Sequence, residues 1–481
     1  MVELAPPSAL AAAAAILRNQ GFDALIDVRR SILVNRWEPW LPDDCRHLAA
    51  PSAGTEPAAL VRLLHLGSPV AAHEVTAETA EVLTAAGLCD RKGADLLPGR
   101  WQLTAYRGLL AVAGREYGGS AADVHLGEDS LRFTDAVLRA APTGTVLDIG
   151  SGSGICAVAA SRTAAHVVAL DVLEDARTAG ELTAALNGGG TLNGGAACRF
   201  TVADFREITG DQHFDVAIAN LPGVPVPAGM PYPAAGNGGP DGLALISPLW
   251  DWFAGPRSAE RMVMRFQSLG DAAAPAVLAE LASRFGASCQ IRVITDSAVP
   301  VVVRDAITAE RVAGLSGRTA AAVLAEIGAA RTRAGHTHFH CSTAVFDRRA
   351  APGLWHLRNH PRLELNRSYG RADSDPDVHQ LGTWYLAQLS LMPDEFWSLD
   401  GGAAGDRVYR QLPELARALA EGATAGQLAA AMPAREGRAT SPTALAGDAL
   451  AVALLAWTLV GAGVLAAPSP SRSLAGVAAR G

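Results

Sequence analysis

Three carboxylates and one amide stand at or near the ends of four separate apolar runs, and they are the side chains best placed to do chemistry. They are Asp148, Asp171, Asp204 and Asn220. A carboxylate accepts hydrogen bonds through two oxygens, whereas an amide both donates and accepts. Parallel strands bring the residues at their carboxyl ends to one edge of a sheet, where α/β proteins bind ligands. The pattern predicts an α/β fold with a site for a nucleoside-like molecule at that edge.

The loop after the first apolar run has glycines at alternate positions. Gly150, Gly152 and Gly154 follow Asp148, with Ser151 after the first glycine. Such glycines let the backbone turn sharply and approach a ligand closely. The segment after them is rich in Ala and Val and predicts a helix whose amino end faces the same ligand. Because the acid lies two positions before the first glycine, the loop differs from the Gly-x-Gly-x-x-Gly fingerprint of dinucleotide-binding proteins.

The spacing Asp-x-Gly-x-Gly-x-Gly resembles motif I of class I S-adenosylmethionine-dependent methyltransferases. The resemblance implies that Asp148 and the glycine loop shape the methionine and ribose side of S-adenosylmethionine, the co-substrate. It also implies that Asp171, followed by Val172, holds the ribose hydroxyls. In the same family Asp204 would accept a hydrogen bond from the adenine amino group, while Phe205 would pack on the ring.

The fourth run ends in the turn Asn220-Leu221-Pro222-Gly223, which resembles the Asn-Pro-Pro-Tyr turn of methyltransferases that act on planar nitrogen atoms. In that family the Asn oxygen and the next backbone carbonyl accept the substrate N–H hydrogens, which aims the nitrogen lone pair at the methyl group. The rate then comes mainly from holding the reactants in a near-attack geometry. The resemblance implies catalytic roles for Asn220, Leu221 and Pro222, with Asn220 also beside the donor.

Two further segments resemble the release-factor glutamine N5-methyltransferases and their small-domain relatives. One is the sequence Gly-Gly-Pro-Asp-Gly-Leu at residues 238–243, and the other is residues 125–131, just before the glycine loop. This resemblance implies acceptor-binding roles for Asp129, Ser130, Asn220 and Gly223.

The turn departs from that family at two positions. Leu221 replaces the first proline, and Gly223 replaces the aromatic residue that stacks on the substrate. A stacking platform contributes about 1–3 kcal/mol per base where one is used. Its loss argues against a nucleobase as the acceptor and favours a small or non-planar molecule.

Composition restricts the partners further. The net charge of −8 argues against a broad nucleic-acid-binding surface, which is normally basic. The six cysteines are scattered without paired spacing, which favours reduced thiols. No basic segment precedes an apolar stretch at the amino terminus, so no export signal is predicted. We expect a cytoplasmic enzyme with a small-molecule acceptor, without nucleic-acid or membrane partners, and leave a homodimer open.

The length of 481 residues favours two or three domains. We predict a helical, winged-helix-like domain over residues 1–122, with a hairpin at 88–103 that turns at Lys92-Gly93. Residues 123–349 form the methyltransferase core, for which the resemblance implies a Rossmann-like sheet of seven strands. A helical domain follows over 350–481. The core is expected to contain helices at 259–267, 274–285 and 319–331 and strands at 290–295 and 336–346.

Two segments raise other possibilities. His336, His338 and His340 would share one face of a strand and could meet at a metal. No cysteine or carboxylate at ligand spacing completes such a site, and methyl transfer needs no metal, so none is predicted. Residues 449–467 form an uncharged apolar run of almost membrane-spanning length. Because this run lacks an aromatic belt and a positive flank, we predict a buried helix.

These observations predict an enzyme that methylates a nitrogen atom in a small amino-acid-derived or specialised metabolite. Two alternatives stay open. One is a protein-glutamine or other macromolecular methyltransferase, and the other is a winged-helix regulator with a degenerate methyltransferase core. A strongly basic winged unit, with no open pocket beside Asn220, would favour the regulator.

Overall fold

The structure is a computed structural model, and most of what it describes belongs to one compact unit that ends at Arg358. The strands β14 and β15 belong to a second unit. The described residues are 5–23, 26, 55–115, 124–189, 198–208, 213–255, 258–271, 273–358, 364–365 and 465–466.

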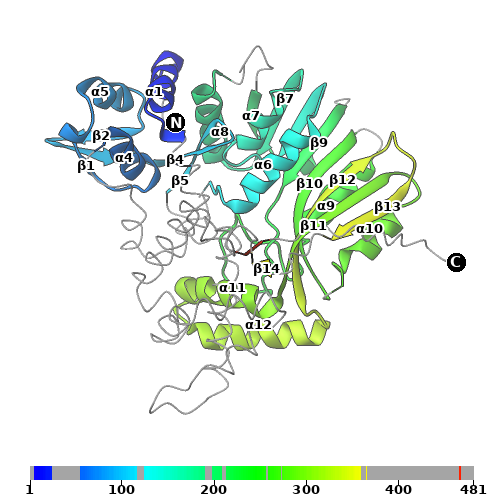
Figure 1. The fold of residues 1–481 in the computed structure, drawn as a ribbon. Helices are drawn as coiled ribbons and strands as arrows, with labels where there is room; N and C mark the ends of the chain where they lie inside the picture. The colour runs from blue at the N-terminus through cyan, green and yellow to red at the C-terminus, as the bar shows by residue number, and fades with distance from the viewer. Residues whose placement is uncertain are drawn as a thin grey trace, which may run out of the picture. The chain divides into compact units, whose positions relative to one another are not determined.

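A mixed sheet of eight strands forms the centre of the first unit (Figure 1). Its order is β13-β11-β12-β10-β9-β6-β7-β8, and β12 runs antiparallel to both of its neighbours. The prediction of seven strands was therefore one short, because β13 adds a parallel strand beside β11 and carries the sheet past residue 349. The strands are β6 (Thr145–Ile149), β7 (His166–Asp171), β8 (Cys198–Val202), β9 (Phe214–Asn220), β10 (Ala259–Gly270), β11 (Gln290–Pro300), β12 (His338–Asp347) and β13 (Gly353–Arg358).

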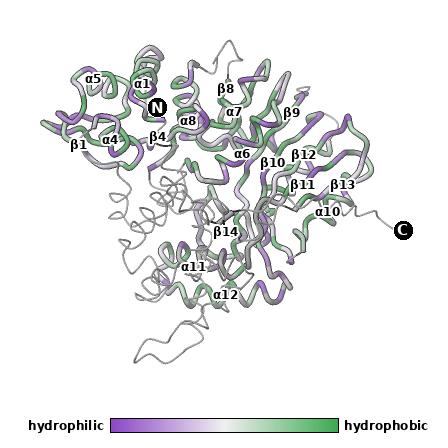
Figure 2. The backbone as a smooth tube through the Cα atoms, in the orientation of Figure 1, coloured by the Kyte–Doolittle hydropathy of each residue, from purple (hydrophilic) through white to green (hydrophobic). Residues whose placement is uncertain are grey.

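Helices cover both faces of this sheet, and each face has its own hydrophobic core. In β9, Val216 and Ile218 pack on the side of α6 and α7, whereas Ala217 and Ala219 pack on the side of α9 and α10. Hydrophobic residues accordingly recur along β9 and β10 in Figure 2, as is usual for strands buried on both faces. The helices are α6 (Glu128–Ala140), α7 (Ile155–Ala160), α8 (Glu174–Leu186), α9 (Ile246–Ala254) and α10 (Val277–Phe285), with a 3₁₀ turn, η5, at Phe205–Glu207.

The helix predicted for residues 259–267 was wrong, because this segment is strand β10. It pairs with β9 on one edge and with β12 on the other, while Met262, Met264 and Phe266 are buried on one face. Short apolar runs fit a helix or a strand by periodicity alone, and here the sheet pairing decides. The other predicted core elements are confirmed as α10, β11, α12 and β12, with small shifts of their ends.

A pair of helices is inserted between β11 and β12. The helix α11 (Val301–Ser316) follows β11 directly, and α12 (Ala320–Ala334) lies beside it before the chain enters β12 (Figure 1). Because β11 runs parallel to β10 and β9, the pair leaves the sheet at the edge where β9 and β10 also end.

The amino-terminal part of the unit packs against α8. Asn187, fully buried after that helix, donates to the Leu110 carbonyl at 2.6 Å and accepts from the Leu110 N–H at 3.1 Å and from Arg18 at 3.0 Å. The predicted hairpin is shorter than expected, since β2 pairs with β3 across Gly93-Ala94 and β4 pairs with β5. The elements are α1 (Pro7–Asn19), α4 (Glu56–Leu60), η2 (Val61–His65), β1 (Val70–Ala71), η3 (Ala72–Glu74), α5 (Ala77–Ala85), β2 (Cys89–Lys92), β3 (Asp95–Pro98), β4 (Trp101–Tyr106) and β5 (Leu109–Gly114).

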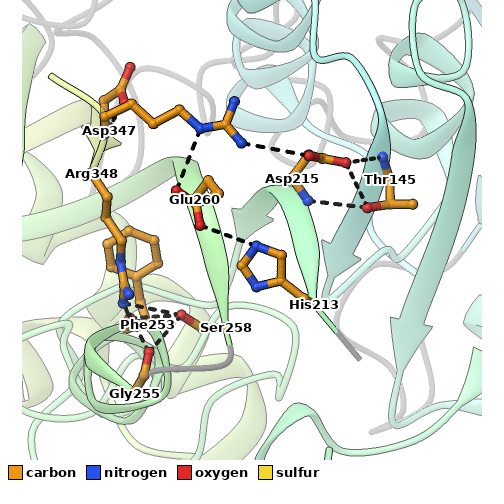
Figure 3. A network of polar contacts seen from close by, with 10 residues as sticks. Thr145, His213, Asp215, Phe253, Gly255, Ser258, Glu260, Asp347 and Arg348 are labelled. Atoms are coloured by element: carbon orange, nitrogen blue, oxygen red, sulfur yellow. Dashed lines mark hydrogen bonds and ion pairs between the residues drawn. The ribbon is translucent and has the colours of Figure 1, made fainter. Parts of the chain in front are cut away.

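A polar network ties together the strand ends at the amino edge of the parallel strands (Figure 3). Asp215 accepts from the backbone N–H of Thr145 at 2.8 Å and from its hydroxyl at 2.9 Å, and these bonds lower the pKa of Asp215. Arg349 lies 3.7 Å from Asp215 and 3.5 Å from Glu260, which also pairs with His213 at 3.2 Å. The charged side chains of this network pair with one another and connect β6, β9 and β10. We therefore assign the network a structural role.

Little of the predicted carboxy-terminal domain falls among the described residues. Most of the helical domain predicted over residues 350–481 lies outside them, including the buried helix predicted in the run 449–467, which we expect to end at Gly461 and Gly463. After these glycines, Leu465–Ala466 forms strand β15 and pairs with β14 (Glu364–Leu365). In the part of the chain that the structure describes, no helix is long and apolar enough to cross a membrane.

Candidate methyl-donor and acceptor site

The structure brings the predicted residues to the carboxyl edge of the sheet. Asp171 and Asn220 are the last residues of β7 and β9, and Asp148 is the last but one of β6. The strands β6, β7 and β9 are parallel neighbours, so these three side chains belong to adjoining strand ends. The expectation that they share one edge is therefore confirmed.

The glycine loop adopts a conformation that other residues rarely reach. Gly150, Gly152 and Gly154 have φ angles of 72°, 51° and 75°. The N–H groups of Gly150 and Ser151 both donate to the Leu170 carbonyl at 2.9 Å, which fixes the start of the loop on β7. A Cβ atom on Gly154 would lie 2.6 Å from the Cα of Gly180, so α7 and α8 approach each other through glycine.

Asp171 is oriented by two backbone donors. Its Oδ2 accepts from the Gly152 N–H at 2.9 Å, and its Oδ1 accepts from the Leu173 N–H at 3.0 Å. Burial nevertheless raises the pKa of Asp171. Beside it, 63% of Val172 is exposed, which is unusual for a large apolar residue next to a buried carboxylate. A carboxylate fixed by backbone bonds, with an apolar side chain beside it, fits a ribose and the adjoining face of an adenine.

Asp148 is buried and has unfilled hydrogen-bonding capacity. Only 2% of it is exposed, and its Oδ2 has no hydrogen-bond partner among the described residues. Burial, together with the negative charge of Asp171, raises the pKa of Asp148 to about 7. A buried, unpaired carboxylate oxygen is costly unless a donor or a cation reaches it. The cationic methionine end of S-adenosylmethionine supplies such a group.

The predicted adenine residues lie differently from each other. The Asp204 carboxylate accepts hydrogen bonds from the Arg206 guanidinium and from the Arg206 backbone N–H, the latter at 2.9 Å. These bonds lower the pKa of Asp204. Phe205 is 7% exposed and packs in the core with Leu170 and Leu221. Its ring is therefore part of the hydrophobic core next to the carboxyl edge of the sheet. Its packing on an adenine stays a prediction.

Asn220 is oriented by a residue from another element. Its Nδ2 donates to Oδ2 of Asp129, in the first turn of α6, at 3.2 Å. Ser130 follows in the same turn. Because a carboxylate oxygen can only accept, the Asn220 amide nitrogen must face Asp129 and its oxygen must face away. This is the orientation that accepts an N–H from a substrate.

The two departures from the family turn have a packing explanation. The Leu221 side chain is buried against the glycine loop, since a Cβ on Gly150 would lie 2.6 Å from its Cδ2. At Gly223 the backbone touches its neighbours closely. A Cβ there would lie 3.3 Å from the Gln267 nitrogen, and a Cβ on Gly242 would lie 2.6 Å from the Gly223 oxygen. An aromatic side chain at position 223 would need these backbones to separate.

The Gly-Gly-Pro-Asp-Gly-Leu segment folds back onto this turn. The Gly238 N–H donates to the Val224 carbonyl at 2.9 Å, and the Val226 N–H donates to the Gly239 carbonyl at 2.7 Å. The segment therefore packs against the chain that follows the Asn220 turn, and its acceptor-binding role stays a prediction. Pro222 is half-buried at the start of the loop.

Sequence reasoning missed an arginine on the acceptor side. Arg265 of β10 lies opposite Asn220 in the parallel pair, is 3% exposed and donates to the Thr343 hydroxyl at 3.3 Å. An arginine inside an apolar run was a signal for it, but the run was assigned to a helix. Its register opposite Asn220 places a buried arginine on the strand next to the predicted acceptor residue.

The three histidines do not form a metal centre. The strand β12 begins at His338, so His336 lies before it. The His340 imidazole bonds to the Asp271 carbonyl at 2.9 Å, and its ring centroid is 6.4 Å from that of His338. Within the described ranges, no group of three or more histidine, cysteine or acidic side chains could hold a metal ion.

Comparison with known proteins identifies the chemistry of this edge. Residues 128–226, which contain the glycine loop, Asp171 and the Asn220 turn, match the model of the ribosomal protein L11 methyltransferase (PrmA) family. The chain carries an S-adenosylmethionine-dependent methyltransferase core. S-adenosylmethionine is therefore its methyl donor. The release-factor glutamine group, which the turn resembles, is a different family and stays a prediction.

Solved structures of several methyltransferases are similar to this methyltransferase in fold. Trm5b from Pyrococcus abyssi is 14% identical, with 57% of this chain and 68% of that chain covered and a TM-score of 0.31. A dimethyladenosine transferase from Plasmodium falciparum is 13% identical, with 45% and 62% covered and a TM-score of 0.25. Ribosomal protein L11 methylase from Lactobacillus delbrueckii subsp. bulgaricus is 20% identical, with 36% and 74% covered and a TM-score of 0.23. No curated protein sequence matches the chain.

These likenesses concern the fold and leave the acceptor open. All three identities are below 25% and all three TM-scores are below 0.5. The chain spans less than two thirds of the dimethyladenosine transferase. Another matched structure is a complex of aTrm5 and tRNALeu, 14% identical with a TM-score of 0.30, and the expectation that nucleic acid is not a partner stays a prediction.

Proposed function

We propose that this methyltransferase transfers a methyl group to a nitrogen atom of a small amino-acid-derived or specialised metabolite. The observation that carries the proposal is the orientation of Asn220. Its amide nitrogen is held by Asp129 at 3.2 Å, so its oxygen is turned towards the space in front of β9. That oxygen can accept an N–H from the acceptor and aim the nitrogen lone pair.

Different residues at this edge would bind the donor and the acceptor. When bound, S-adenosylmethionine supplies an electrophilic methyl group on a sulfonium. Asp171 would accept both ribose hydroxyls, and Asp148 would face the cationic methionine end. Asn220 and the Leu221 carbonyl would accept from the acceptor nitrogen, so that the lone pair, methyl carbon and sulfur lie in line. Catalysis then comes mainly from positioning the reactants. In well-oriented intramolecular reactions, positioning lowers the activation barrier by roughly 7–11 kcal/mol.

A small acceptor is supported by the shape of the turn. Gly223 offers no ring for stacking, and a Cβ at this position would lie 3.3 Å from the Gln267 nitrogen. Cytoplasmic location and a homodimer stay predictions.

A macromolecular acceptor, such as a protein glutamine, is the second candidate. The match of residues 128–226 to a family named for a ribosomal-protein methyltransferase favours it. A protein side chain reaches the same turn through its terminal nitrogen, so the role of Asn220 would not change. The two candidates differ only in the molecule that carries this nitrogen, which is a small metabolite in one case and a macromolecule in the other.

The regulator hypothesis has weaker support. The order β1-β3-β2 with α5 before the hairpin agrees with the winged-helix-like unit that we predict. However, α5 carries Glu78 and Glu81 and no lysine or arginine, so it would repel a phosphate backbone. The unit packs on α8 through Asn187, which favours a scaffold role.

Methyl-labelled S-adenosylmethionine tests the acceptor class. The full chain is incubated with a small-metabolite extract and, separately, with a protein and ribosome fraction from the same cells. The proposal expects label in a low-mass product, identified by its added methyl mass, and no label above the Asn220→Ala background in macromolecules. Label only in macromolecules, protein or RNA, would establish the second candidate and refute the first.

A further inference from the structure

The inserted helices α11 and α12 make close contact with the acceptor side of the site. The last residue of β11, Pro300, pairs with the first residue of β12, His338, so the insertion leaves and re-enters the sheet at one point. This point is at the carboxyl edge, where β9 ends in Asn220 (Figure 1). The loop that follows Asn220 runs under the helices from residue 221 to residue 245.

An apolar cluster joins this loop to both helices. Three of its side chains come from the loop, two come from α11 and two come from α12. None is more than 7% exposed. The members are Val224, Val226, Met230, Ala309, Val312, Val323 and Ile327. The cluster is separate from the two cores of the sheet, one of which packs on the two ends of the loop through Leu221, Leu243 and Leu245.

One guanidinium links the two limbs of the loop. Arg331 of α12 donates to the Pro225 carbonyl at 2.8 Å and to the Pro240 carbonyl at 3.0 Å. Its third donor reaches Oδ1 of Asp305, on α11, at 3.1 Å. Pro225 lies just after the Asn220 turn, whereas Pro240 lies in the segment that folds back on it. A single side chain therefore joins both limbs to the helix pair, in addition to the backbone bonds that join the limbs to each other.

The pair of charges is held inside the protein. Arg331 is 5% exposed and Asp305 is 3% exposed. Burial raises the pKa of Asp305, and the charge of Arg331 opposes that rise. The guanidinium is planar and presents its donors in a fixed fork, so it sets directions as well as distances. An ammonium has no such fork and would reach fewer of these acceptors.

We propose that the α11–α12 pair is a cap over the acceptor side of the site, and that Arg331 is a positioning residue that fixes the loop after Asn220. The inference rests on the proposed function, because it assigns the loop to the acceptor. Arg331 touches no reacting atom. It acts by holding the Asn220 turn, through Pro225, at the place where the nitrogen must meet the methyl group.

The test compares four variants of the full chain. Arg331→Met removes the fork, Arg331→Lys keeps the charge without the fork, and Asp305→Asn keeps the shape without the charge. The matched control is Arg318→Met, because Arg318, in the turn between the two helices, pairs with Glu326 of α12 at 2.6 Å and both side chains are exposed. If Arg331→Met does not fold, Arg331→Lys and Asp305→Asn still decide the question.

Three measurements are made on each folded variant. Hydrogen exchange follows the backbone amides of residues 221–245 against those of residues 145–171. Calorimetry gives the affinity for S-adenosylhomocysteine. Methyl transfer from labelled S-adenosylmethionine is measured with the fraction in which the unmutated protein labels a product.

We expect Arg331→Met to raise exchange in residues 221–245 only and to leave the S-adenosylhomocysteine Kd within about twofold. Methyl transfer should fall by about 10-fold to 100-fold, because small misplacements of reacting groups have effects of this size. Arg331→Lys should lie between Arg331→Met and the unmutated protein, and Arg318→Met should match the unmutated protein.

Two results would overturn the inference. One is that Arg331→Met shows the same hydrogen exchange and the same methyl transfer as the unmutated protein. The other is an equal loss of S-adenosylhomocysteine binding and of methyl transfer in a folded variant. Failure of the proposed function gives a different result. The unmutated protein would then label no low-mass product, while the exchange in residues 221–245 would still report whether Arg331 holds the loop.

Discussion

The donor half and the acceptor half of this site differ in how far apart along the chain their partners lie. On the donor side, Gly152 and Asp171, which bond to each other, are 19 residues apart. On the acceptor side, Asn220 and Asp129 are 91 residues apart, and Arg331 and Pro225 are 106 apart. The donor half is one local βαβ unit, whereas the acceptor half is assembled from α6, β9, β10 and an inserted helix pair.

This difference separates two kinds of dependence on the fold. A pocket made by consecutive segments keeps its shape when a distant element moves. A turn held by α6 on one side and by α12 on the other loses its position when either contact is lost. Substitutions in the two halves should therefore affect different quantities, the affinity for the donor in one case and the rate of transfer in the other.

The largest expected effect is on the acceptor side. Asn220→Ala should lower turnover by about 10²–10³, the usual loss for one preorganised hydrogen-bonding group in a closed site. Its S-adenosylhomocysteine affinity should stay close to that of the unmutated protein, because the donor half is unchanged. Asp129→Asn should lose less, since its side-chain oxygen can still accept from Asn220 in one of its two orientations. Turnover near the unmutated rate in Asn220→Ala would remove this turn from the reaction and with it the nitrogen assignment.

The next effect concerns the backbone of the donor half. Gly154→Ala and Gly189→Ala both place an alanine at positive φ, 75° and 72°, where left-handed strain costs about 1–2 kcal/mol. Only at Gly154 would the new methyl also meet backbone, 2.6 Å from Gly180, whereas nothing lies within 4 Å at Gly189. Gly154→Ala should therefore be about 1–3 kcal/mol less stable than Gly189→Ala in urea unfolding. Equal stabilities would mean that α7 and α8 are not tightly packed.

The same contrast explains what the sequence could and could not predict. The glycine loop and Asp171 form a local pattern, and the structure has them where the pattern placed them. The strand β10 was taken for a helix, because its pairing with β9 and β12 comes from segments far away in the chain. No spacing rule connects Arg331 with Pro225 either. Long-range packing decided both cases.

The amino-terminal part of the first unit also shows this limit. Its hairpin follows from turn residues, so it could be predicted, although its turn is at Gly93-Ala94. Its position against α8 depends on Asn187, whose four hydrogen bonds reach Arg18, Leu110 and Thr183. An asparagine after a helix looks like an ordinary helix end in the sequence. The contacts that make it a joint between two parts of the chain appear only in the structure.

A smaller effect should appear as a pH dependence of donor binding. The folded pKa of Asp148, about 7, is above its value in the unfolded chain. Asp148 therefore destabilises the free protein increasingly as the pH rises towards 7. The cationic donor favours the ionised form, so its binding should strengthen over the same window. S-adenosylmethionine affinity should rise by up to about tenfold between pH 6 and pH 8, as expected for one linked proton.

The variant Asp148→Asn provides the control for this pH dependence. It should bind the donor more weakly at pH 8 and lose the rise in affinity between pH 6 and pH 8. It should also unfold at higher urea concentration than the unmutated, donor-free protein at pH 8, because no buried charge remains. An unchanged pH profile in this variant would assign the proton to another group.

The central claim is that S-adenosylmethionine binds at the ends of β6 and β7, with Asp171 on its ribose. Calorimetric titration of S-adenosylhomocysteine into the unmutated protein and into Asp171→Ala and Asp175→Ala tests it most directly. Asp175 is the matched control, because it lies four positions further on and pairs with Arg100. The account predicts that Asp171→Ala weakens binding by about tenfold, or ~1.4 kcal/mol, while Asp175→Ala binds as the unmutated protein does. Equal affinity in all three proteins would contradict it.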